Sequence, residues 1–178
     1  EDLSRWEVCT ILSKSIKKLG GIWECPDFFM VDGKYALCVS PMEMMPDNNG
    51  FHIGHCTLAV IGDYNKETYE FTPEHYQPID WGIDYYAPQS SVTADGRRVN
   101  MAWMQACSNS RFVPAGKKYF GQLALPRELH ITNGRLVQNP IRELENYRGE
   151  KVEYQKVSVT EEELRLEGIS GRMADMTV

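Results

Sequence analysis

The sequence lacks several features that define whole classes of proteins. No apolar run approaches the ~18 residues that a membrane-spanning helix needs. Residues 1–6 do not join a basic region to an apolar stretch, so the start of the chain does not resemble a signal peptide. Lys and Arg total 19 against 25 Asp and Glu, a net charge of −6, which leaves no excess of positive charge for phosphate backbones or anionic lipid. We therefore expect neither nucleic acid nor a membrane as a partner.

A disulfide framework and a zinc ribbon are also missing. The five cysteines are odd in number, irregularly spaced and never form C-x-x-C. The string His52-Ile53-Gly54-His55-Cys56 looks like the start of a metal site, but a structural zinc needs four ligands and no second cluster lies near it in sequence. We predict reduced thiols, no metal, and a cytoplasmic location, because disulfides are rare in that compartment.

The strongest local signals are β-hairpin turns. Asp32-Gly33, Asp95-Gly96 and Asn133-Gly134 each separate two apolar, strand-prone runs. A further strand is expected at residues 56–61, where Gly62-Asp63 would end it, with residues 68–71 as its possible return. Helical periodicity is scarce, and only residues 10–19 suggest a short helix before Gly20-Gly21.

This pattern predicts an all-β fold. Repeated antiparallel hairpins suit a sandwich, a barrel or a propeller. The step from Asp95-Gly96 to Asn133-Gly134 matches the ~40–50 residues of one four-stranded propeller blade, which adds weight to the propeller without excluding the other two.

The segment IWECPDFF at residues 22–29 is the first candidate for chemistry. Glu24 lies there between Trp23 and Cys25, with two phenylalanines close by. Apolar surroundings disfavour the charged form of a carboxyl group, as a general acid working near neutral pH requires. The alternative is a Glu at the edge of a strand whose carboxylate reaches solvent.

Five motifs in order resemble glycoside hydrolase family 32, the invertases, fructanases and sucrose-6-phosphate hydrolases. IWECPDFF resembles the acid/base motif of that family. The other four are IDWGIDYYAPQ at residues 79–89, GRRVNMAWM at 96–104, GQLALPREL at 121–129 and LVQNPIREL at 136–144. Ala124 stands where the family usually has Ser or Thr. From the first to the last, the motifs span residues 22–144, about two-thirds of the chain.

The resemblance implies a five-bladed β-propeller followed by a C-terminal β-sandwich, and a retaining glycosidase that needs no cofactor. Residues 1–148 would form about blades three to five, and residues 149–178 a linker and the first strands of the sandwich. Glu24 would be the general acid/base. The substrate would be sucrose, sucrose 6-phosphate or a fructan, and transfer to another sugar instead of water remains an alternative.

The same resemblance suggests residues that bind the substrate. Asp80 and Asp84 flank Gly82 and can accept hydrogen bonds from sugar hydroxyls, although Asp84 can equally make a structural hydrogen bond. Trp103 is either a platform for a sugar ring or a core residue. Cys25 follows Glu24, and alternation along a strand favours a supporting role or simple packing. We expect Arg127 and Glu128 to form a structural ion pair.

Two motifs of the family do not occur in the sequence. These are W-x-N-D-P-N-G, which carries the nucleophile, and R-D-P, which carries a carboxylate that stabilises the transition state. We therefore expect a fragment that begins at about the third blade and self-associates through unpaired strand edges. A non-catalytic, carbohydrate-binding propeller is the second hypothesis, and the sequence upstream would distinguish the two.

Overall fold

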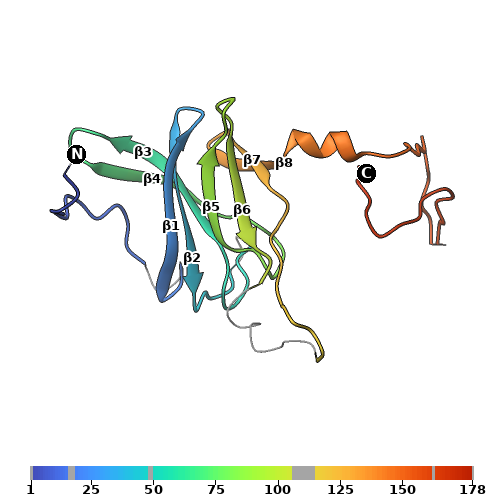
Figure 1. Cartoon of the computed structure of the whole chain (residues 1–178), viewed down its shortest axis with the longest axis horizontal. Helices are drawn as coiled ribbons and strands as arrows, with labels where there is room; N and C mark the ends of the chain where they lie inside the picture. Colours follow the sequence, from blue (N-terminus) through green and yellow to red (C-terminus); the bar gives the residue numbers. More distant parts are fainter. Residues whose placement is uncertain (1, 16–18, 48–49, 106–114, 162, 178) are drawn as a thin grey trace. The chain divides into compact units, whose positions relative to one another are not determined.

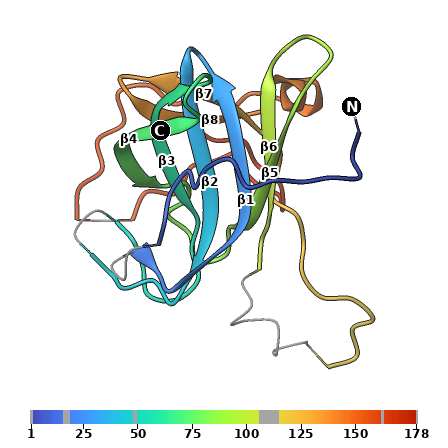
Figure 2. The same ribbon diagram turned by 90° about the vertical axis from the view of Figure 1, so that its left-hand side faces the viewer.

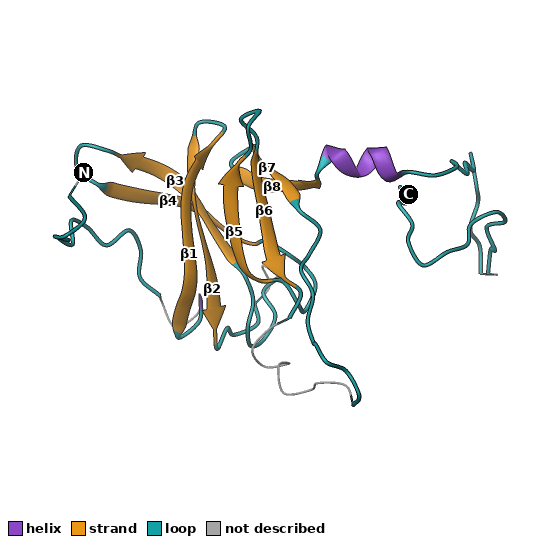
Figure 3. Cartoon of the chain, in the orientation of Figure 1, coloured by secondary structure: helices purple, strands orange, loops and turns teal. Residues whose placement is uncertain are grey.

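The structure is a computed structural model of the 178-residue chain. It describes all residues except 1, 16–18, 48–49, 106–114, 162 and 178. The chain divides into two units, Glu1–Ile141 and Arg142–Val178. Strands dominate the first unit, so the all-β prediction is confirmed (Figures 1 and 3).

The first unit contains two four-stranded antiparallel sheets, each with its strands in sequence order. The first sheet consists of β1 (Ile22–Val31), β2 (Lys34–Met42), β3 (Leu58–Asn65) and β4 (Glu70–Pro78). The second consists of β5 (Tyr86–Val92), β6 (Arg98–Trp103), β7 (Arg127–Thr132) and β8 (Arg135–Pro140). Two consecutive meanders of four strands are the arrangement of two propeller blades.

The predicted hairpin turns all occur, but they are of two kinds. Asp32-Gly33 and Asn133-Gly134 have positive φ at both central residues, as a two-residue turn that matches strand twist requires. The Asp95-Gly96 turn is longer: residues 93–97 lie between β5 and β6, and the amide of Thr93 donates to the carbonyl of Arg97 over 2.8 Å. Only Gly96 has a positive φ there.

The third strand continues beyond its predicted end. The sequence suggested that Gly62-Asp63 ends this strand, yet β3 runs through both residues to Asn65. Gly62 is needed for close approach instead, since a Cβ on it would lie 2.1 Å from the carbonyl oxygen of Thr72 on β4. The helix suggested for residues 10–19 does not form at residues 10–15, whereas Leu19 has 3-10 geometry and residues 16–18 lie outside the described residues.

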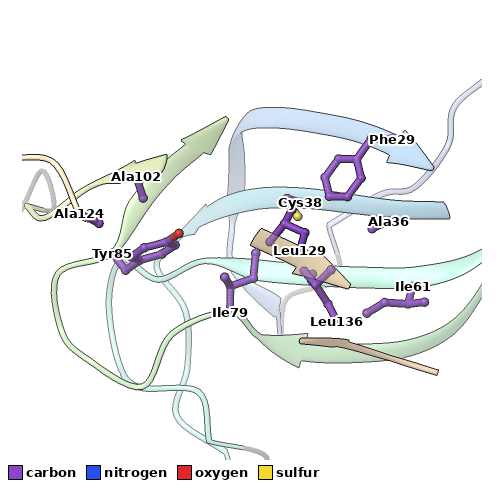
Figure 4. Close-up of a cluster of buried hydrophobic side chains, with 11 residues drawn as sticks. Phe29, Ala36, Cys38, Ile61, Ile79, Tyr85, Ala102, Ala124, Leu129 and Leu136 are labelled. Carbon is purple, nitrogen blue, oxygen red and sulfur yellow. The ribbon is translucent and has the colours of Figure 1, made fainter. Parts of the chain in front are cut away.

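A hydrophobic cluster joins the two sheets. Phe29, Cys38 and Ile61 come from the first sheet, and Leu129 and Leu136 from the second (Figure 4). A second cluster, which includes Leu58 and Val60, combines strands of the first sheet with Met44, Phe51 and Cys56 from the connection between β2 and β3. Because residues alternate between the two faces of a strand, the long apolar runs in β2 and β3 bury both faces of the first sheet.

Polar side chains also connect the sheets. The side chain of Gln77 on β4 bonds the backbone of Leu136 on β8 twice, accepting from its amide and donating to its carbonyl. Asp32, in the β1–β2 turn, accepts a hydrogen bond of 2.9 Å from the amide of Ile131 on β7. These bonds fix the position of one sheet against the other.

The second unit has little regular structure. Its 3-10 helix, η2, spans Arg142–Tyr147, and residues 149–161 and 163–177, which are the described part of the remainder, form no strand. The boundary at Ile141 lies a few residues before the predicted one at 148. The assignment of residues 149–178 to a sandwich remains a prediction. Within the described residues, no helix is long and apolar enough to cross a membrane.

Candidate active site

Glu24 lies near the start of β1, opposite Ser40 of β2. Its side chain is half-buried, and its Oε2 atom accepts a hydrogen bond of 2.8 Å from the hydroxyl of Tyr86. Tyr86 begins β5 in the second sheet and is only 2% exposed. The candidate acid is therefore fixed by a buried donor from the neighbouring sheet.

A β-bulge shapes the backbone next to Glu24. The pairing of β1 with β2 shifts between Glu24 and Asp27, and Cys25 has a φ of +50°. The carbonyl of Cys25 accepts a hydrogen bond of 3.2 Å from the side chain of Gln89, and the Asp27 carboxylate accepts one of 2.7 Å from the amide of Ser90. Bulges re-aim side chains, so simple alternation along the strand does not hold for Cys25, which is exposed. Its contact with a substrate remains a prediction.

A second layer supports Tyr86. The fully buried Ser40 accepts a hydrogen bond of 2.9 Å at its Oγ from the amide of Ala87, and its carbonyl lies 3.2 Å from the Tyr86 hydroxyl. The ring of His55 lies edge-on to that of Tyr86, with the centroids 5.6 Å apart. Figures 1 and 2 show β1, β2 and β5 side by side, which is how the two sheets bring these residues together.

Sequence reasoning missed Tyr86, Ser40 and His55. Tyr86 lies in the IDYYA string that directed attention to Asp80 and Asp84 instead. Both tyrosines of this string are buried, but only Tyr85 belongs to the cluster between the sheets, whereas the hydroxyl of Tyr86 bonds Glu24. The sequence pattern could not say which carboxylate either tyrosine would meet.

Asp80 is held by protein groups. Its Oδ2 atom lies 2.8 Å from Nη1 of Arg127, and its Oδ1 atom accepts a hydrogen bond of 2.7 Å from the amide of Gly82. The Arg127 guanidinium lies over the ring of Tyr85, 4.1 Å from its centroid. Burial raises the pKa of Tyr85 to about 12, and the charge of Arg127 opposes this rise. None of these contacts reaches Glu24, and a sugar-binding role for Asp80 remains a prediction.

Asp84 and Trp103 are both partly exposed. Asp84 is half-buried in the connection between β4 and β5. Trp103 ends β6, where its Cα pairs with that of Tyr86, and it is 42% exposed. The structure thus places Trp103 beside the residue that holds Glu24 and leaves part of its indole free to contact a ligand. Whether either residue binds sugar remains a prediction.

The expected ion pair between Arg127 and Glu128 does not form. The two residues are neighbours on β7 and point to opposite faces of the sheet. Arg127 pairs with Asp80, whereas the buried Glu128 accepts a hydrogen bond of 2.8 Å from Arg97. Each motif arginine therefore stabilises a different face of the second sheet.

The described thiols divide into two exposed and two buried groups. Cys9 and Cys25 are exposed, whereas Cys38 and Cys56 are buried, and Cys107 lies outside the described residues. Burial, with a smaller contribution from Asp47, raises the pKa of Cys56 to about 12, and burial also raises that of Cys38. The described residues contain no group of three or more His, Cys, Asp or Glu side chains arranged to hold a metal ion.

This division predicts which thiols react. Because the thiolate is the nucleophile, a pulse of iodoacetamide at pH 8 should alkylate Cys9 and Cys25 and leave Cys38 and Cys56 unmodified in the folded chain. Peptide mapping by mass spectrometry measures each site, and the same pulse in guanidinium should label all four. Equal labelling of Cys38 and Cys9 in the folded chain would contradict the structure.

Comparison with known proteins identifies the family. Residues 1–140 match the N-terminal domain of the glycosyl hydrolases of family 32. The chain belongs to this family. It is 35% identical over 147 residues to a raffinose invertase of Escherichia coli and 33% identical over 149 residues to a probable sucrose-6-phosphate hydrolase of Psychromonas ingrahamii. These matches cover 82% and 83% of the chain but only 30% and 27% of the two relatives.

Solved structures of family 32 share the fold. A β-fructofuranosidase of Bombyx mori superposes with a TM-score of 0.73 at 30% identity, over 85% of this chain and 32% of the other. A mutant of the same enzyme in complex with sucrose gives a TM-score of 0.74, also at 30% identity. The two meanders of this chain are thus part of the propeller of family 32. The chain spans about a third or less of the length of the relatives it matches.

Proposed function

We propose that this chain is the acid/base portion of a β-fructofuranosidase, with Glu24 as the proton donor to the leaving group. The hydrogen bond from buried Tyr86 to Glu24 supports this role, because it fixes the carboxyl group on the strand that carries the Trp-Glu-Cys-Pro string of the family. The relatives named raffinose invertase and sucrose-6-phosphate hydrolase favour a β-fructoside of the sucrose type as substrate.

The proposed reaction retains configuration at the anomeric carbon. One carboxylate attacks that carbon while Glu24 protonates the departing oxygen; Glu24 then removes a proton from the water that releases the sugar. The family carries its attacking carboxylate in the motif W-x-N-D-P-N-G, and this motif does not occur in the chain. The R-D-P motif, which carries the carboxylate that stabilises the transition state, does not occur in it either. The 178 residues alone are therefore expected to release no fructose.

One experiment tests this proposal against the two alternatives. The chain alone and a longer protein that joins it to a W-x-N-D-P-N-G segment are incubated with sucrose, and the sugars are separated by chromatography. Glucose and fructose in equal amounts support a hydrolase, and an excess of glucose with longer fructosides indicates a fructosyltransferase. Saccharide binding without turnover by the longer protein would support the non-catalytic propeller. If the purified chain releases fructose and Glu24→Gln abolishes this release, the nucleophile lies within the 178 residues and the proposal is wrong on this point.

Tyr86 is expected to assist Glu24 in the transition state. As Glu24 gives up its proton it becomes a carboxylate, and a hydrogen bond to a charged group is stronger than one to a neutral group. Tyr86→Phe in the longer protein should lower kcat about 10-fold or more, because such a bond contributes about 1.5–3 kcal/mol. Rates of fructose release from sucrose at a fixed pH measure the effect. A loss of rate that only follows a loss of folded protein in urea would make Tyr86 a purely structural residue.

Self-association and compartment remain predictions. Each sheet has two edge strands, and exposed edges can pair with those of another copy. Sedimentation of the chain should show an oligomer, and a stable monomer would contradict this prediction. The proposed cytoplasmic location rests on the cysteine pattern alone.

A further inference from the structure

A cavity of about 620 Å³ lies between β4 and β8, the fourth strands of the two sheets. The residues that matter for its chemistry are Gly50, Tyr76, Asp80, Trp81, Arg127 and Arg135. Its size is that of a pocket for a small organic ligand. Glu24 lies on β1, and three strand spacings, or ~14 Å, separate β1 from β4. The cavity is therefore distinct from the candidate active site.

Trp81 forms an exposed but fixed wall of this cavity. Its side chain is 79% exposed, although large aromatic residues are usually buried. Its ring lies directly on the backbone of Gly50, where a Cβ would come within 2.0 Å of Cζ3. Gly50 has a φ of +92°, which also favours glycine. The indole is thus held in place on one side and open on the other.

The polar wall is fixed as well. Asp80 is held by the amide of Gly82 at 2.7 Å and by Arg127 at 2.8 Å, and Arg127 is held in turn by the ring of Tyr85. The charges of Asp80 and Arg127 offset one another, so this pair offers oriented donors and acceptors without a net charge of its own, and Arg135 adds a further donor to the lining. A phosphate group would meet the Asp80 carboxylate, whereas hydroxyl groups can bond both partners.

We propose that this cavity is a second carbohydrate site, which binds one ring of a neutral saccharide such as sucrose or a fructan. The apolar CH face of the ring packs on Trp81, and its hydroxyl groups bond Asp80 and Arg127. The site does not depend on the role of Glu24, so this proposal stands or falls separately from the proposed activity.

The 178-residue chain itself can be tested. It contains four tryptophans, whose indole N–H signals can be resolved by NMR and assigned by substitution. Titration with sucrose, and with a fructan oligosaccharide, should shift the Trp81 signal saturably and leave the Trp6 signal in place. Trp81→Ala should weaken binding at least about tenfold, because it removes the apolar area that the sugar covers. Trp6→Ala is the matched control, since Trp6 is 80% exposed and does not line the cavity.

A second variant tests the same site without removing the indole. Gly50→Ala should displace the Trp81 ring and weaken binding to a similar extent, with an unchanged circular dichroism spectrum. In Glu24→Gln, saccharide should still shift the Trp81 N–H signal to the same extent. If the Trp81 signal no longer shifts in this variant, the saccharide binds at Glu24 and the proposal is overturned. Binding of glucose 6-phosphate or inorganic phosphate without any binding of sucrose would overturn it too, as would the absence of a saturable Trp81 shift up to the solubility of the sugar.

Discussion

Replacing Glu24 by Gln should lower the rate of sucrose hydrolysis by about 10²–10⁴ in a protein that joins this chain to the nucleophile motif, the usual range for loss of a general acid/base. The amide keeps the shape of the side chain but has no proton to give to the departing oxygen. Because Tyr86 donates to Glu24 over 2.8 Å, and the amide oxygen can still accept this bond, the fold around the site should be retained. Initial rates of fructose release on sucrose measure the effect.

Substrates with different leaving groups distinguish a role of Glu24 in proton transfer from a role in positioning the substrate. Glu24→Gln should slow the hydrolysis of a fructoside whose leaving group departs without a proton much less than it slows the hydrolysis of sucrose. Tyr86→Phe provides a comparison in which the acid itself remains. An equal loss of rate on both substrates would assign Glu24 to positioning. Unfolding of Glu24→Gln in denaturant should coincide with that of the original protein.

The hairpins could be predicted because they depend on local chemistry. Asp32-Gly33 and Asn133-Gly134 adopt the positive φ angles that only a few residue types tolerate, so the string alone locates the turn. The end of β3 could not be predicted in this way. Gly62 looks like a turn residue in the sequence, and its real role, close contact with β4, depends on a strand ten residues further on.

The candidate site was predictable only in part for the same reason. Glu24 was found through a contiguous string, whereas its partner Tyr86 is 62 residues away and belongs to another sheet. The partner of Asp80 could not be predicted either. Its motif was recognised, but the arginine that holds it comes from β7, and no local pattern reveals that pairing. Contacts between blades are set by the packing of whole sheets, and a sequence scan does not supply them.

The largest effect on stability is expected at Arg97. Its guanidinium lies 2.8 Å from the carboxylate of Glu128, a residue that is 5% exposed, and its Nε atom lies 2.7 Å from Asp95. Removing one partner of a buried ion pair leaves the other charge in a poorly solvated position, which destabilises a protein by about 3–5 kcal/mol. Arg97→Met should therefore lower the free energy of unfolding of the chain by this amount, as measured by urea denaturation.

Two comparisons decide whether burial of Glu128 is the cause. Lys34→Met removes a cation that pairs with Asp63 and Glu74 in a solvent-accessible position, so it should shift the urea midpoint far less. The double variant Arg97→Met with Glu128→Leu should recover part of the loss, because two apolar side chains then replace the pair and no charge is left buried. If the double variant is less stable than Arg97→Met alone, the destabilisation comes from lost packing of the arginine side chain instead of the loss of its charge beside the buried carboxylate. The GRR and LPREL strings of this chain would then contribute shape, not charge, to the second sheet.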